Sequence, residues 1–115
     1  MHKILILLIL SFFSYSNYAN NTVSFNCKGI SQFELIGSSG KKEEMKNISF
    51  DFIDGKLQDL NNIDCQWSEK IISCESNFLN IRRLTINQET NEVSDFIAGN
   101  KGFGQYTETF KGKCN

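Results

Sequence analysis

Few side chains in this sequence have the type and spacing that catalysis needs. The single histidine, His2, precedes a long apolar run near the start of the chain. If that run is removed as a signal peptide, no histidine remains for general acid–base catalysis or for a Ser–His or Cys–His nucleophile pair. Four aspartates remain as candidates for a pair of catalytic carboxylates: Asp51, Asp54, Asp59 and Asp64.

A hydrolase built on two carboxylates needs both of them in one cleft. The four aspartates fall in turns and at solvent-facing positions, which are ordinary places for acids. The segment from Asp59 to Asp64 also lacks the central glycine of a calcium-binding loop, and Lys70 stands where its final glutamate would be. We therefore expect that the protein is not an enzyme, and a carboxylate-based hydrolase is only the second alternative.

The chain has four cysteines: Cys27, Cys65, Cys74 and Cys114. None of their spacings is that of a zinc knuckle, and no Cys-x-x-Cys redox motif is present. We expect no metal and no cofactor. In a small exported protein, four cysteines predict two structural disulfides.

The start of the chain has the order of a secretory signal peptide. A short basic segment ending at Lys3 is followed by an apolar run beginning at Ile4 and a polar stretch that ends at Ala19. The apolar run is shorter than the ~20 residues that cross a bilayer. We expect residues 1–19 to be removed. Residues 20–115 should form a single β domain, periplasmic or secreted, that does not span a membrane.

The stretch from Ile63 to Glu75 predicts a hairpin that orients the rest of the chain. Apolar residues and a cysteine share one parity on each side of a polar tip at Ser68-Glu69-Lys70. If the loop is residues 68–71, Cys65 lies opposite Cys74 and Trp67 opposite Ile72. We therefore favour the pairing of these two cysteines, with Cys27 bonded to Cys114.

Alternating apolar and polar residues predict short strands along the whole mature chain. The first runs from Val23 to Cys27 and ends at Gly29, and the stretch 37–46 is expected to be the longest loop. Asp54-Gly55 signals a tight hairpin that sets Phe52 opposite Leu57. With eight or nine strands and no helical period, we expect an all-β antiparallel meander that forms a small barrel. A β-sandwich is the alternative.

A barrel of this size is filled by its own side chains. The expected core includes the large aromatic residues Phe25, Phe50, Phe52, Phe110 and Trp67. Three residues are candidate binding residues: Trp67, Arg82 and Arg83. Trp67 lies near an exposed turn, where an aromatic side chain can anchor a partner, although its parity predicts an inward direction. A solvated face is the plain interpretation of Arg82-Arg83, with one arginine at the start of its strand.

The predicted mature chain carries 11 basic side chains, the 12 of the full sequence less Lys3, against 13 acidic ones. A net charge of about −2 without a basic stripe does not suggest nucleic acid as a partner.

Several short motifs resemble those of small exported β-rich bacterial proteins with two disulfides. They lie at residues 25–29, 52–57, 65–67, 72–74, 84–92 and 110–114. The resemblance implies export and the β fold, but no activity and no site residues. We expect a binding or interaction protein, for example an inhibitor or immunity-type partner of an envelope enzyme. A carrier of a small apolar ligand inside the barrel is the first alternative.

Overall fold

The computed structural model describes residues 21–37, 40–59, 62–77, 80–102 and 104–115. This part of the chain contains strands and turns and no helix. The predicted signal peptide lies outside it. The strands are β1 (Thr22–Leu35), β2 (Lys41–Ile53), β3 (Lys56–Leu57), β4 (Cys65–Trp67), β5 (Ile71–Ser76), β6 (Ile81–Asn87), β7 (Glu92–Lys101) and β8 (Gly104–Cys114).

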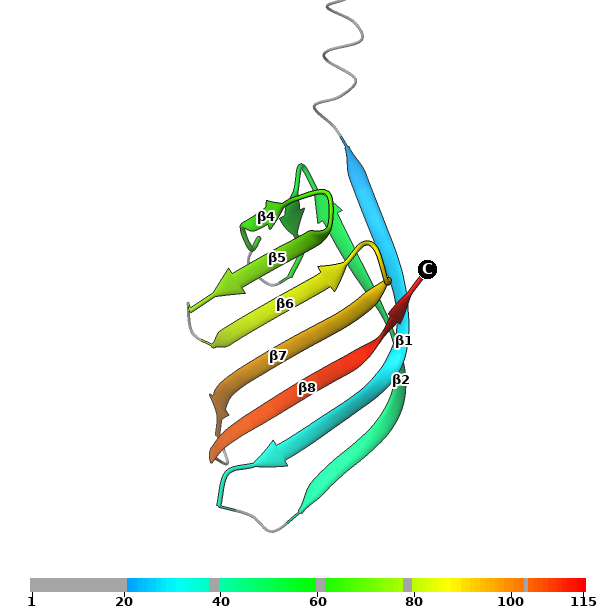
Figure 1. Ribbon diagram of the computed structural model, residues 1–115. Coiled ribbons are helices and arrows are strands. Elements are labelled where there is room, and N and C mark those ends of the chain that lie inside the picture. The colour runs from blue at the N-terminus through cyan, green and yellow to red at the C-terminus, as the bar shows by residue number, and fades with distance from the viewer. Residues whose placement is uncertain (1–20, 38–39, 60–61, 78–79, 103) are drawn as a thin grey trace, which may run out of the picture.

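The strands form one eight-stranded sheet in the order β3-β2-β1-β8-β7-β6-β5-β4. Every named pairing is antiparallel. Neighbours in the sheet are neighbours in sequence except at one place, where β1 pairs with β8 (Figure 1). The predicted all-β antiparallel fold is confirmed, and the sheet curls into a nearly closed barrel.

Both predicted disulfides are present. Cys27 lies opposite Cys114 across the β1–β8 pair, and Cys65 lies opposite Cys74 across the β4–β5 hairpin. Trp67 lies opposite Ile72, as the predicted loop length requires. The first bond joins residues 87 positions apart and the second joins residues 9 apart.

The predicted Asp-Gly turn joins β2 to β3. Asp54 and Gly55 both have positive φ, 52° and 79°, which matches the twist that a two-residue hairpin loop requires. Phe52 lies opposite Leu57. The turn therefore places the side chain of Leu57 on the inner face of the sheet, where it is 1 % exposed.

The two ends of the sheet meet at this hairpin. Leu57 and Ile63 exchange two backbone hydrogen bonds of 2.9 Å. The indole N–H of Trp67 donates to the carbonyl oxygen of Gly55 at 2.9 Å. Figure 1 shows β4 close to the β2–β3 hairpin, while the opposite ends of the strands remain apart. These contacts close one end of the barrel only.

A glycine pair lets the sheet bend sharply beside the first disulfide. Gly29 lies opposite Gly112, and a Cβ atom on Gly112 would come within 2.3 Å of the Lys28 carbonyl oxygen. No other residue fits so close a backbone approach. The predicted end of the first strand at Gly29 was therefore wrong, because β1 continues through the bend to Leu35.

Strand β2 is longer than predicted. The stretch 41–46 was expected to lie in a loop, yet β2 begins at Lys41 and pairs with β1 over its whole length. Charged residues dominate this stretch, so the alternation that marks a buried face is absent from it. Its register with Phe33 and Glu34 of β1 extends the sheet beyond the apolar core.

The inner face of the closed end forms one apolar cluster. Its buried members are Cys27, Phe50, Phe52, Leu57, Ile63, Ile72, Cys74, Leu84, Ile86, Val93, Phe110 and Cys114. Phe50, Phe52 and Phe110 are thus core residues, as predicted, and Phe25 is partly buried against them. Trp67 differs from the prediction, because it lies at the margin of the cluster and is 41 % exposed.

Candidate functional site

Trp67 lies where the two ends of the sheet meet. Its ring contacts Phe52 edge-on, with ring centroids 5.2 Å apart, and its N–H is bonded to Gly55. The side chain therefore has a structural role in closing the barrel. Its exposed part is also available to a partner.

Arg82 does not lie on a solvated face, in contrast to the interpretation from sequence. It shares the inner face of β6 with Leu84, and its side chain is only 15 % exposed. The guanidinium donates to both carboxylate oxygens of Asp95 on β7, at 3.3 and 3.0 Å. It also forms an ion pair with Asp59. Arg82 is thus held between two acids at the margin of the core.

Asp95 was not among the candidate residues predicted from the sequence. Its side chain is 6 % exposed, and it lies opposite both Leu84 and Phe110, two core residues. Burial raises the pKa of the Asp95 carboxyl, and the nearby acids Asp59 and Glu108 act in the same direction. The hydrogen bonds and charge of Arg82 oppose this rise only in part.

The pKa of Arg82 is raised in turn. Burial alone lowers it, but the hydrogen bonds and charge of Asp95 and Asp59 outweigh this effect. The guanidinium therefore holds its charge more strongly than a free arginine side chain does. This arrangement stabilises a charge at the margin of the core.

Arg83 lies on the outer face. It is exposed, opposite Glu75 on β5 and Phe96 on β7. The structure therefore separates the two candidate arginines, with Arg82 inside and Arg83 outside. Neither lies in a common site with Trp67 among the contacts described here.

Three of the four candidate aspartates contact different side chains in the described part of the chain. Asp51 accepts hydrogen bonds from Ser24 and Ser49, Asp59 pairs with Arg82, and Asp64 pairs with Lys56 at 3.5 Å. The fourth, Asp54, lies in the β2–β3 turn.

The outer, convex face carries a group of lysines that we call the lysine face: Lys28, Lys111 and Lys113. Lys28 on β1 lies directly opposite Lys113 on β8, and Lys111 follows on the same face of β8. All three are exposed. Among the described residues none of them forms an ion pair, although Glu92 lies opposite Lys113 on β7.

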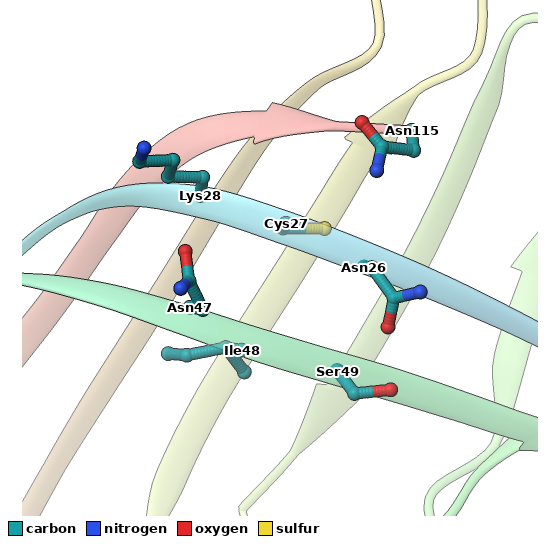
Figure 2. A pocket seen from close by; sticks show the side chains of 7 residues that line it. All are labelled: Asn26, Cys27, Lys28, Asn47, Ile48, Ser49 and Asn115. Carbon is teal, nitrogen blue, oxygen red and sulfur yellow. The ribbon is translucent and has the colours of Figure 1, made fainter.

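Two hollows flank the lysine face. One has a volume of about 380 Å³ and is lined mainly by polar residues of β1, β2 and the chain after β8. Figure 2 shows the side chains of Asn26, Asn47 and Asn115 around the stretch of β1 that carries Lys28. The other hollow, of about 540 Å³, lies over β6–β8 and includes Lys111 and Lys113.

Directly opposed like charges destabilise a strand pair. The Lys28–Lys113 pair therefore has an electrostatic cost that the described residues do not offset by an ion pair. Amide donors and acceptors beside it add groups that hydrogen-bond to a polar partner. The arrangement is suited to holding an acidic surface.

The sequence contained a signal for this face. Strand parity alone places Lys28, Lys111 and Lys113 opposite in direction to Cys27 and Cys114. Once those two cysteines are paired, the register of β1 and β8 follows, and with it the position of Lys28 opposite Lys113. No basic stripe is visible along the sequence, because the three lysines come together only through the register of β1 with β8.

Within the described residues, no group of three or more acidic, cysteine or histidine side chains is placed to hold a metal ion. The same part of the chain contains no helix with the length and apolar character needed to cross a membrane.

Comparison with protein-family models, with curated proteins and with solved structures finds no match for the chain. The fold itself defines the class of protein: an all-β, nearly closed eight-stranded sheet with two disulfides. The two disulfides are consistent with an oxidising compartment.

Proposed function

We propose that the protein is an exported binding protein whose lysine face binds an acidic surface of a protein partner. An inhibitor or immunity-type partner of an envelope enzyme fits this description. The periplasm or the exterior of the cell is the proposed location, supported by the predicted signal peptide and by the two disulfides.

The observation that carries the proposal is the opposition of Lys28 and Lys113. Two exposed ammonium groups on facing positions repel each other, and a partner carboxylate between them would remove that repulsion. Complementary charge across an interface also raises the rate of association and suppresses binding of wrong partners. A small rigid sheet braced by disulfides presents such groups with little loss of conformational freedom on binding.

The apolar-ligand carrier is the weaker alternative. It requires an enclosed pocket of several hundred cubic ångströms. The inner face is instead occupied by a continuous cluster of buried side chains. The side-chain arrangement likewise favours binding over hydrolysis, since Asp51, Asp59 and Asp64 contact different side chains.

The test is affinity capture from envelope extracts with the mature, oxidised protein and two charge-reversal variants. One variant combines Lys28→Glu with Lys113→Glu. The matched control combines Lys56→Glu with Lys70→Glu, two exposed lysines away from this face that form ion pairs with Asp64 and Glu89. We expect a partner that the native protein and the control retain and the first variant loses.

Retention of that partner should weaken with added salt, because exposed charges are screened over about 10 Å at 0.1 M ionic strength. Equal retention by all three proteins would contradict the proposal. Circular dichroism of each variant checks that the loss is not one of folding.

A further inference from the structure

One edge of the sheet is open along most of β2. Strand β3 covers only Phe52 and Ile53, and in the described part of the chain no strand pairs with the outer edge of residues 41–51. The carbonyl oxygen of Asp51 points to that side, because it accepts a hydrogen bond from the N–H of Gln58 at 2.9 Å. Backbone direction alternates along a strand.

It follows that five residues direct both their N–H and their C=O groups to the open edge: Lys41, Glu43, Met45, Asn47 and Ser49. Such an edge is a template for another strand. Natural proteins block open edges with charged side chains, and β2 carries several. The question is therefore which partner strand the charges of β2 would accept.

An exposed apolar pair lies beside this edge. Met45 is 70 % exposed and Ile30, its neighbour on β1, is 49 % exposed. Both point to the outer face. A partner strand with an apolar residue opposite Met45 would cover them.

We propose that β2 of one molecule pairs antiparallel with β2 of a second copy, with Met45 on the two-fold axis. In this register Met45 lies opposite the Met45 of the other copy, and Glu43 lies opposite Asn47. All of these residues direct their backbone groups to the open edge, so each facing pair exchanges hydrogen bonds. The outer face then carries a row of four apolar side chains, Ile30 and Met45 from each copy.

The charges of the inner face match in this register. Glu44 of each copy lies opposite Lys46 of the other, which gives two ion pairs related by symmetry. Within one molecule these side chains already lie 3.2 Å apart, so both are near the edge and able to exchange partners. Lys46 also lies 3.6 Å from Glu108.

The neighbouring symmetric registers lack this match. With Glu44 on the axis, Glu44 faces its own copy and Lys42 faces Lys46. With Lys46 on the axis, Lys46 faces its own copy and Glu44 faces Ile48. The register with Glu43 on the axis would pair Lys42 with Glu44, but it sets Glu43 opposite its own copy on the outer face. The charges of β2 therefore favour the register with Met45 on the axis.

Cysteine cross-linking tests the register. In a hydrogen-bonded antiparallel pair the facing Cα atoms lie about 5.5 Å apart, within the range that a disulfide spans. We expect Met45→Cys to give a covalent dimer on oxidation. Asn47→Cys is the matched control on the same edge and face, and its copies would lie roughly 13 Å apart along the strands. It should remain uncross-linked.

Charge exchange tests the same contact without cysteines. Sedimentation velocity over roughly 1 µM to 1 mM measures dimerisation, a range chosen because a single-edge interface falls below the about 1,200 Å² of standard complexes. Glu44→Lys and Lys46→Glu should each raise the dissociation constant at least tenfold. Mixing these two variants should restore a dimer, because every facing pair is then of opposite sign.

A monomer over the whole concentration range would overturn the proposal, provided that circular dichroism shows the native fold. So would cross-linking of Asn47→Cys as efficient as that of Met45→Cys, or a mixture of the two charge variants that stays monomeric. The lysine-face variants should leave the dimer unchanged, so this inference and the proposed function fail independently.

Discussion

Arg82→Met is the substitution that tests most directly how the polar residues at the margin of the core are held. Methionine keeps much of the length of the side chain but removes the guanidinium. Asp95 then loses two hydrogen bonds, of 3.3 and 3.0 Å, and remains a carboxylate that is 6 % exposed.

The expected loss follows from these contacts. Removing one member of a buried ion pair costs about 3–5 kcal/mol, because the other charge is left unpaired. Two effects place the loss at the lower end of this range. Arg82 is 15 % exposed, and in the variant Asp95 can bind a proton, which removes part of the cost of burying its charge. We therefore expect the free energy of unfolding to fall by about 3 kcal/mol at pH 7, measured by urea denaturation and the fluorescence of Trp67.

The loss should depend on pH. Burial raises the pKa of Asp95 above its ordinary value of 3.8, and Arg82 provides the hydrogen bonds and positive charge that oppose the rise. Without Arg82 the pKa of Asp95 rises further. When the pKa of a carboxyl is higher in the folded chain than in the unfolded chain, the stability of the fold decreases as the pH rises above the pKa of the unfolded chain. The variant should therefore lose less stability near pH 4 than at pH 7.

Arg83→Met is the matched control, because Arg83 is the neighbouring residue and lies exposed on the outer face. It should change stability by less than about 0.5 kcal/mol. Adding Asp95→Leu to Arg82→Met removes the unpaired carboxylate and should recover part of the loss. Equal losses for the two arginine variants, or a loss independent of pH, would refute this account of the ion pair.

Three further predictions concern the frame of the sheet. Replacing Cys27 and Cys114 by alanine should lower the free energy of unfolding by about 4–5 kcal/mol, against about 2–3 kcal/mol for removing the hairpin disulfide, because the first bond closes a longer loop in the unfolded chain. Equal losses in urea denaturation would contradict this dependence on loop length. Gly112→Ala should lower the free energy of unfolding by about 1–3 kcal/mol, because the added Cβ overlaps the backbone of β1. Gly40→Ala, where a Cβ meets nothing within 4 Å, should change it by less than about 0.5 kcal/mol. Thermal unfolding of the two variants compares them. Trp67→Phe keeps an aromatic ring but loses the hydrogen bond to Gly55. We expect the free energy of unfolding to fall by about 1 kcal/mol, measured by circular dichroism. An unchanged free energy of unfolding would show that this hydrogen bond does not help to close the barrel.

Much of the fold follows from local rules that sequence displays. The β4–β5 hairpin was predictable because loop length and strand parity together set Cys65 opposite Cys74. The β2–β3 turn was predictable because Asp54-Gly55 accepts the positive φ values that a tight hairpin needs. Pairing the first and last cysteines then joined β1 to β8 and defined the order of the sheet.

The buried ion pair was not predictable in the same way. Strand parity places Asp95 on the inner face with Val93, but a charged residue is normally assigned to solvent. Only the pairing of β6 with β7 brings Arg82 near enough to offset its burial, and Asp59 joins them from a separate loop. These contacts are non-local, so no stretch of sequence displays them.

The bend at Gly29 was missed for a related reason. A lone glycine in an alternating segment usually ends a strand or marks a bulge. Here it faces Gly112, 83 positions away along the chain, and the two together let the strands approach and turn. The lysine face and the open edge of β2 both depend on that continuous β1.

The single non-sequential pairing, β1 with β8, has a consequence for how the chain reaches its fold. All other strand contacts form between neighbours in sequence, so a hairpin unit of β1–β3 and a meander of β4–β8 can each assemble from short-range contacts. The two units join only when the strand that ends at Cys114 pairs with β1. This pairing links residues far apart in the sequence, so it raises the contact order, and we expect it to be the slow step in folding. Until then the edges of β1 and β8 are unpaired and exposed. The Cys27–Cys114 disulfide can form only after the two strands pair in the correct register.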